Sequence, residues 1–136
     1  STIEALLVEK KLVVENDINE DLILRTDKES FRSIFSNLLN NAIKYSPTGS
    51  KIVFNAVKEK KSIVISIKDN GYGIEKNSIK RVFERFYRSS KARAHTKGTG
   101  LGLALVKQLS SRIGANVKVE SQINVGSEFF VSFQDK

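Results

Sequence analysis

Residues 31–46 carry four polar side chains at positions that a helix would bring together. Asn37, Asn41, Lys44 and Tyr45 are spaced four, three and one residues apart, so a helix of about 3.6 residues per turn places them on one flank. Two amides, an ammonium and a phenol in a row could bind a ligand that is flat, polar and anionic. A solvated helix face is the alternative, because the segment also has an apolar stripe of helical period.

A second candidate group follows residues 62–68, whose alternation of apolar and polar residues predicts a strand. The group consists of Asp69, Gly71 and Gly73. A carboxylate at a strand end could accept a hydrogen bond from an exocyclic amine such as that of adenine. The glycines would let the backbone approach a ligand face without an intervening Cβ atom. Asp-Asn-Gly is also an ordinary turn sequence, so this group by itself is a weak signal.

A third group lies at the start of a predicted helix at residues 101–113. Gly98, Gly100 and Gly102 permit left-handed backbone conformations, and the exposed N–H groups together with the helix dipole favour phosphate. The glycine spacing differs from the Walker and dinucleotide patterns, and no strand precedes it. A plain glycine-rich connector is the alternative, but the strongly helical sequence that follows favours phosphate binding.

Composition bounds the class of protein. The 136 residues suit one globular domain, and the formal net charge of +8 favours anionic partners. The absence of Cys excludes disulfides and thiolate metal sites, and no apolar run approaches the ~20 residues that a membrane helix needs. The N-terminus lacks a signal-peptide pattern. Because the chain has no Met, it is expected to be a fragment of a longer protein.

Basic residues are densest at residues 80–97, where aromatic residues separate them, a pattern that would also suit nucleic acid. Four cations could neutralise phosphates, although each could equally be a solvated surface charge: Lys44, Arg88, Arg93 and Lys97. His95, the only histidine, has no carboxylate beside it in the sequence and is interpreted as exposed rather than nucleophilic.

The elements that must position these groups follow from periodicity, caps and turn residues. A capping box at residues 26–29 starts the central helix, Pro47 ends it, and Gly114 ends the helix at 101–113. The other expected elements are helices at 1–9 and 77–86, strands at 12–18, 22–26, 51–57, 62–68, 116–122 and 127–133, and a mobile loop at 87–99. This order predicts helices layered on one face of a mixed sheet, an α+β sandwich.

Together, the ordered motifs closely resemble the ATP-binding catalytic (HATPase_c) domain of sensor histidine kinases, in the superfamily shared with gyrase-type ATPases. The motifs are Asn37-x3-Asn41-x2-Lys44-Tyr45, Asp69-x-Gly71-x-Gly73, Phe83-x2-Phe86 and Gly98-x-Gly100-x-Gly102. The resemblance covers residues 27–136, and residues 1–26 are expected to be a helix end and the first strands of the same single domain. It implies a two-layer sandwich with about five strands, about three helices on one face, and a flexible ATP lid.

The resemblance also implies roles by matching position. Asn41 would be the Mg²⁺ ligand through its amide oxygen, with Asn37 near the phosphates and metal and Lys44 on a phosphate, and these three are the implied catalytic residues. Asp69 would hold the adenine amine, and Tyr45 would lie against the base. The other residues implied at the nucleotide are Gly71, Gly73 and Ile74 on the adenine side, Phe86 with Phe83 at the base of the lid, and Arg88, Arg93, Lys97, Gly98, Thr99, Gly100, Leu101 and Gly102 on the phosphate side.

One position separates a kinase from an ATPase. In the gyrase-type relatives a Glu one turn before the metal-binding Asn activates water, and here that residue is Asn37, whose amide cannot accept a proton at neutral pH. Slow hydrolysis is therefore expected, which leaves the γ-phosphoryl group for another acceptor. Ser33 departs from the acidic or amide residue that these kinases often carry one further turn back.

The phosphorylated His of the family lies on a separate helical hairpin, and this sequence has no such His-Glu or His-Asp motif. The resemblance implies a monomeric catalytic domain that does not autophosphorylate alone. Its partners would be the dimerisation and phosphoacceptor domain of its parent and a downstream response regulator, with no nucleic acid. A cytoplasmic location and a dimeric parent are implied, and a membrane anchor is left open. The alternatives are a related ATPase, an anti-sigma serine kinase, or a non-catalytic module whose basic lid recruits a partner or nucleic acid.

Overall fold

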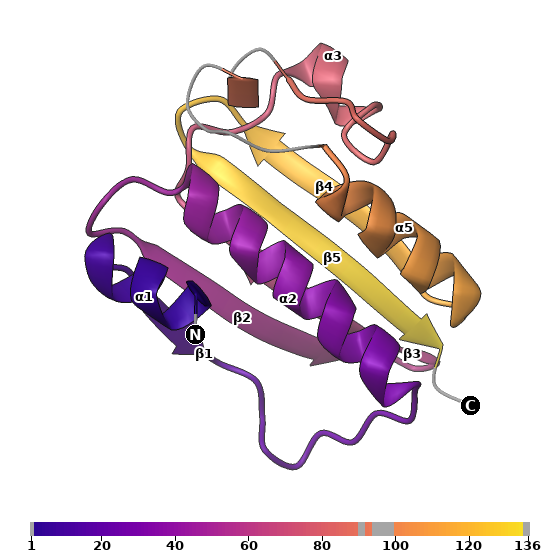
Figure 1. Cartoon of the computed structure of the whole chain (residues 1–136). Helices are drawn as coiled ribbons and strands as arrows, with labels where there is room; N and C mark the ends of the chain where they lie inside the picture. Colours follow the sequence, from indigo (N-terminus) through magenta and orange to yellow (C-terminus); the bar gives the residue numbers. More distant parts are fainter. Residues whose placement is uncertain (1, 90–91, 94–99, 135–136) are drawn as a thin grey trace.

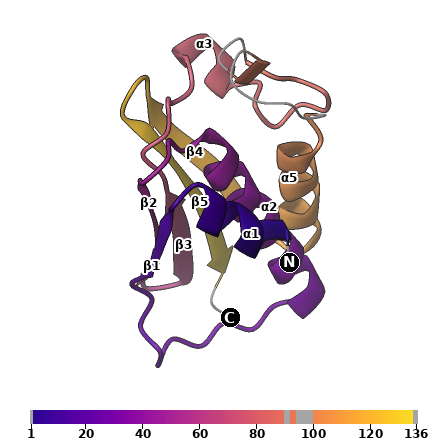
Figure 2. The same cartoon turned by 60° about the vertical axis from the view of Figure 1, so that its left-hand side comes forward.

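A five-stranded sheet covered by helices on one face forms the domain, and the computed structural model describes residues 2–89, 92–93 and 100–134. The strands are β1 (Val13–Asn16), β2 (Lys51–Lys58), β3 (Ser62–Lys68), β4 (Asn116–Gln122) and β5 (Gly126–Gln134). Their order is β1-β2-β3-β5-β4, with β1 parallel to β2 and the other neighbours antiparallel. Figures 1 and 2 show α1 (Thr2–Glu9), α2 (Lys28–Tyr45) and α5 (Gly102–Arg112) on one face of the sheet. The predicted α+β sandwich is confirmed.

The central helix α2 is defined by its two ends. Its N-cap is Asp27, whose Oδ2 accepts a hydrogen bond from the Ser30 N–H at 2.9 Å, so the cap lies one residue after the predicted Thr26. At the other end, Ser46 is extended before Pro47, as predicted. Lys10, from the segment after α1, donates its ammonium to the Ile43 carbonyl at 2.6 Å. A cation at the helix C-terminus satisfies a free carbonyl and opposes the helix dipole.

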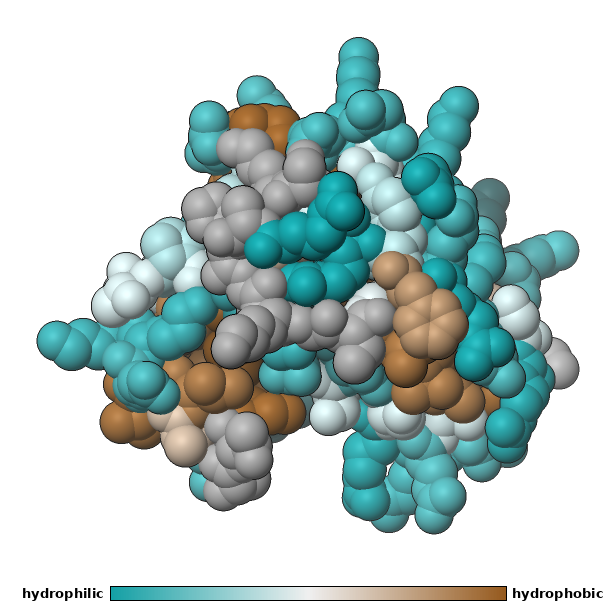
Figure 3. All heavy atoms as spheres, turned by 45° about the horizontal axis from the view of Figure 1, so that its top comes forward, coloured by the Kyte–Doolittle hydropathy of each residue, from teal (hydrophilic) through white to brown (hydrophobic). Residues whose placement is uncertain are grey.

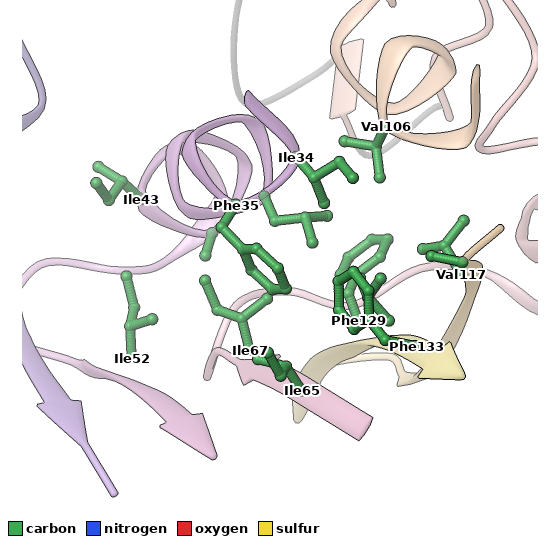
Figure 4. Packing of buried hydrophobic residues seen from close by; sticks show 14 of the residues in the cluster. Ile34, Phe35, Ile43, Ile52, Ile65, Ile67, Val106, Val117, Phe129 and Phe133 are labelled. Carbon is green, nitrogen blue, oxygen red and sulfur yellow. The ribbon is translucent and has the colours of Figure 1, made fainter. Parts of the chain in front are cut away.

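The core lies between α2, α5 and the sheet. Figure 4 shows apolar side chains of α2 and α5 pointing toward those of the strands. The stripe of Ile34, Leu38 and Ala42 is fully buried, as its helical spacing predicts. Burial of a large aliphatic side chain stabilises a fold by about 1.5–3 kcal/mol. This packing therefore fixes the polar flank of α2 relative to the strand ends.

Two predicted elements differ from the structure. Residues 22–26 form no strand; Leu22 and Leu24 pack against the core as side chains while their backbone joins no ladder. The predicted helix at 77–86 is only the four-residue α3 (Lys76–Ile79). After it the chain makes turns with hydrogen bonds between residues three apart, such as Glu84 N–H to Arg81 O. Within these tighter turns the ring of Phe83 packs edge to face against Phe129 of β5, with 6.1 Å between the ring centroids.

The predicted mobile loop at 87–99 falls largely outside the described residues, as does His95. The described part is irregular at residues 87–89 and has a helical turn at 92–93. The predicted strands at 51–57, 62–68, 116–122 and 127–133 and the helix at 101–113 are confirmed within a few residues, and Gly114 ends α5 with a φ of +73°. In the described ranges, none of the helices combines the length and apolar character needed to cross a bilayer.

Candidate functional site

A cavity opens where the C-terminal half of α2, the loop after β3 and the start of α5 converge. Its volume of about 120 Å³ is roughly ten times what one buried water needs, so it can hold a ligand. Its lining includes many of the residues predicted from the sequence: Asn37, Asn41, Lys44, Tyr45, Asp69, Gly73, Ile74, Arg88, Gly100 and Gly102. Three stretches that are distant in the sequence therefore meet at one site.

Asp69 supplies a buried carboxylate to this cavity. It directly follows β3 and is only 4% exposed. Its Oδ1 accepts two backbone hydrogen bonds, from Gly71 N–H at 2.8 Å and from Ser127 N–H at 3.2 Å. Burial raises the pKa of Asp69 to about 6, and these two hydrogen bonds oppose the shift. No donor within the described ranges reaches Oδ2, which leaves that oxygen to accept a hydrogen bond from a ligand.

Close backbone approaches fix the wall around Asp69. A Cβ atom on Gly73, whose φ is +80°, would collide with the carbonyl of Gln122, the last residue of β4. A Cβ atom on Gly126 would collide in the same way with the Asp69 carbonyl. The rings of Tyr45 and Tyr72 meet edge to face at 5.3 Å beside this wall. The two loops thus hold each other, and only glycine fits at both contacts.

The end of the cavity that the sequence predicts to hold phosphates is formed where α5 begins against α2. The side-chain N–H of Asn37 donates to the Ser33 carbonyl at 2.8 Å, which fixes the amide. A Cβ atom on Gly102 would lie only 3.3 Å from Asn37 Oδ1, so the N-terminus of α5 sits directly against this amide. Backbone N–H groups at a helix start favour anions, and this start borders the cavity together with Lys44 and Arg88.

Residues 86–88, at the start of the predicted lid, are held by hydrogen bonds to Gly100, Ser78 and Ala92. Gly100 is left-handed, with a φ of +75°, and its carbonyl accepts the Phe86 N–H at 2.9 Å. Tyr87 shares a hydrogen bond of 2.6 Å with Ser78 of α3, and Arg88 donates to the Ala92 carbonyl at 3.0 Å. Figure 3 looks onto this end of the molecule, where hydrophilic side chains gather.

Several predicted residues are not brought to the cavity. Gly71 packs instead against the Tyr45 carbonyl, and Leu101 is the residue directly before α5. Phe86 is 68% exposed, and it lines a different surface hollow together with Arg93. Their contact with a nucleotide stays a prediction. Lys97, Gly98 and Thr99 lie outside the described residues.

The cavity also has lining residues that the motifs did not indicate. They are Asn40, Tyr72, Val82, Tyr87, Ser89, Ala92 and Ser127, whereas Leu103, which also lines the cavity, ends the glycine-rich segment at residues 98–103 that the sequence indicated. Ser127 is the most consequential, because its backbone N–H donates to Asp69. Its position opposite the end of β3 depends on strand pairing, which no local sequence signal specifies. Asn40 could have been found, since it stands beside Asn41.

The donor set suits a hard cation only in combination with a ligand. Among the described residues, no cluster of three or more His, Cys, Asp or Glu could hold a metal ion. Asn37, Asn40 and Asn41 offer amide oxygens at the phosphate side of the cavity. Mg²⁺ prefers oxygen ligands and retains waters, so one or two amides with phosphate oxygens fit it.

Comparison with known proteins agrees with this geometry. Residues 26–136 match the family described as "Histidine kinase-, DNA gyrase B-, and HSP90-like ATPase". The chain belongs to this family. Over 111 residues it is 37% identical to the sensor histidine kinase WalK of Bacillus subtilis, covering 79% of this chain and 18% of WalK.

Solved structures give the same assignment within the family. The mycobacterial sensor histidine kinase MprB superposes with a TM-score of 0.83 at 27% identity, covering 98% of this chain and 90% of that one. Full-length ShkA, solved in complex with AMPPNP, gives a TM-score of 0.81 at 28% identity, covering 96% of this chain and 27% of ShkA. The chain spans only 18 to 28% of the length of its curated relatives, which are sensor kinases with further sequence.

Proposed function

We propose that this chain is the catalytic domain of a sensor histidine kinase, which binds ATP with Mg²⁺ and transfers the γ-phosphoryl group to a His on a separate dimerisation domain. The observation that carries the proposal is the single cavity that unites Asn41, Asp69 and Gly100. A purine suits the end with the buried carboxylate, and three phosphates suit the end with the amides, cations and helix start. The AMPPNP complex of the relative ShkA supports this ligand class.

Each end of the cavity has a distinct task. Asp69 Oδ2 accepts the exocyclic amine of adenine, and Tyr45 lies beside the base. Lys44, Arg88 and the N–H groups from Gly100 onward oppose the phosphate charge. Asn41, one helical turn after Asn37 in α2, would offer its amide oxygen to Mg²⁺. The metal, if bound there, would help to neutralise the charge of the phosphates.

The reaction then needs an acceptor from outside the chain. A His nitrogen attacks Pγ, the bond from Pγ to the bridging oxygen breaks, and ADP leaves with the electron pair. The chain contributes by orienting the phosphates rather than by removing a proton. Asn37 cannot activate water as a carboxylate would, which supports transfer to His over hydrolysis. We further propose a cytosolic location, a response regulator as the final acceptor, and no role for nucleic acid.

Labelled ATP tests the function. The chain is incubated with γ-labelled ATP and Mg²⁺, alone and with the His-bearing domain of its parent protein. We expect label on the added domain in an acid-labile phosphoramidate, no label on the chain itself, and slow release of phosphate when no acceptor is present. Brisk hydrolysis without an acceptor would instead indicate an ATPase. Stable label on the chain would contradict the division of catalysis and acceptor between two domains.

A further inference from the structure

The last turn of α2 is completed by a lysine from another part of the chain. The last four carbonyls of a helix lack partners within it, and the N–H of residue 47 would normally serve the Ile43 carbonyl. That residue is Pro47, which has no N–H. The Lys10 ammonium takes its place, because Nζ donates to the Ile43 carbonyl oxygen at 2.6 Å and to the Lys44 carbonyl oxygen at 3.3 Å. A distant segment thus supplies the donor that the helix itself lacks.

Lys10 is itself held in place by the fold. Its carbonyl accepts the Gly49 N–H at 2.8 Å, and the N–H of Val13 donates to the Ser50 carbonyl at 3.2 Å. The side chain of Leu12, between these two bonds, is buried in the core. The segment after α1 is therefore joined to the turn after α2, so the backbone that carries the Lys10 side chain is fixed.

The turn that Lys10 completes carries two residues of the cavity. Lys44 and Tyr45 are the last residues of α2, and both line the cavity, whereas Lys10 does not. The Tyr45 carbonyl also lies so close to Gly71 that a Cβ atom there would collide with it. The end of α2 therefore touches the loop after β3, which carries Asp69 at the base end of the cavity.

We propose that Lys10 is a positioning residue for nucleotide binding, which keeps the last turn of α2 helical and so holds Lys44 and Tyr45 at the cavity. The inference rests on the proposed function, because it takes ATP to be the ligand of the cavity. Lys10 acts through the backbone of α2 and not by contact with the ligand. Without the ammonium, the Ile43 carbonyl loses its donor in a partly buried position, which is costly. The last turn then unwinds to let water reach this carbonyl, while the rest of the domain stays folded.

Lys10→Met tests this role, because it removes the ammonium and keeps a long, flexible side chain. We expect amide hydrogen exchange at Lys44 and Tyr45, followed by NMR, to accelerate about tenfold, with exchange in β3 unchanged. The Kd of the whole chain for ATP with Mg²⁺, measured by calorimetry, should rise about tenfold. If the methionine variant does not fold, Lys10→Gln, whose shorter side chain does not reach the Ile43 carbonyl, replaces it with the same expectation.

Two controls separate positioning from the mere loss of a positive charge. Lys11→Met removes the same charge from the neighbouring, exposed residue and should change the Kd for ATP by less than about twofold. Pro47→Ala gives residue 47 an N–H that can donate to the Ile43 carbonyl. In this background, Lys10→Met should therefore weaken ATP binding only about twofold.

The inference and the proposed function fail in different ways. A loss of affinity in Lys10→Met that is equal in both backgrounds, or no larger than in Lys11→Met, overturns the inference alone. Accelerated exchange in the last turn of α2 with unchanged ATP affinity also overturns it. A wild type that does not bind ATP overturns the proposed function and the inference with it.

Discussion

Asp69 concentrates the chemistry of the base end in one side chain. Its position after β3 takes it out of water, while two backbone N–H groups hold one oxygen and leave the other directed at the cavity. Its carboxylate is the useful form, because only an ionised Oδ2 is a pure acceptor for an amine. Yet burial disfavours that form and raises the pKa of Asp69 to about 6. ATP binding is therefore favoured by the ionised form of Asp69, whereas folding is favoured by the protonated form.

The first prediction concerns pH. Because the folded-state pKa of Asp69 is raised above its unfolded value, its contribution to stability is full at low pH and is lost as pH rises through about 6. Between pH 7 and 5 the free energy of unfolding of the ligand-free chain should increase as pH falls. The affinity for ATP, measured with excess Mg²⁺ to keep the phosphates deprotonated, should decrease over the same range.

Asp69→Asn is the control for that prediction, because other groups also titrate. In the variant, the free energy of unfolding should increase less than in the wild type as the pH falls from 7 to 5, because Asp69 no longer contributes to it. Parallel curves for the two proteins, from denaturant unfolding at each pH, would show that Asp69 is not the group responsible.

At the scale of elements, the start of β5 and the residue after β3 approach so closely that only glycine fits at position 126. Gly126 has a φ of +142°, and a Cβ atom there would collide with the Asp69 carbonyl. Gly126→Ala should therefore destabilise the fold by about 2 kcal/mol or more and weaken ATP binding, because β5 must move away from Asp69. Gly114 is a matched control, with a φ of +73° and open space around its Cβ position.

Gly114→Ala should cost about 1 kcal/mol of stability for its backbone strain and leave ATP affinity unchanged. Thermal unfolding and calorimetry of both variants check the pair. Equal effects on ATP binding would mean that the contact between Gly126 and Asp69 does not shape the site.

Helix α5 contains a buried hydroxyl that its surroundings do not satisfy. Ser110 is 1% exposed, and its Oγ has no hydrogen-bond partner among the described residues. Removing an unsatisfied buried hydroxyl relieves a desolvation cost, and alanine also favours a helix. Ser110→Ala should therefore stabilise the chain by about 1 kcal/mol. Ser111→Ala, its exposed neighbour, should gain only the smaller helix-propensity effect, and denaturant unfolding of both would test the difference.

The periodicity of apolar residues predicted the helices and strands whose form depends on one buried face. The alternation at residues 62–68 and the stripe of Ile34, Leu38 and Ala42 gave β3 and α2 correctly, because burial selects those periods. The early end of α3 was not predicted. The residues after it pack against β5 through Phe83 and Phe129, a contact between segments that are far apart in the sequence. Ser127 was missed for a related reason. Its N–H reaches Asp69 because β5 pairs with β3, and that pairing is visible only in the folded chain.

Across the whole molecule, the site lies where helix α2, the loop after β3 and the start of α5 meet. The core fixes α2 over the sheet, so the polar flank of α2 faces the loop after β3 and the start of α5. No single element carries a complete site, which explains why each motif was ambiguous when taken alone. A ligand that contacts all three stretches should also stabilise the whole fold, because it binds the folded chain and not the unfolded one.

A calorimetric titration of ATP with Mg²⁺ into the wild type and Asp69→Asn tests the central claim most directly. Asparagine keeps the shape and the Oδ1 acceptor of Asp69 but replaces Oδ2 with an N–H donor, which would face the adenine amine. We predict saturable binding by the wild type, and affinity at least 100-fold weaker in a variant whose unfolding shows it to be fully folded. Equal affinity in the two proteins would contradict the placement of the purine at Asp69 and, with it, the proposed site.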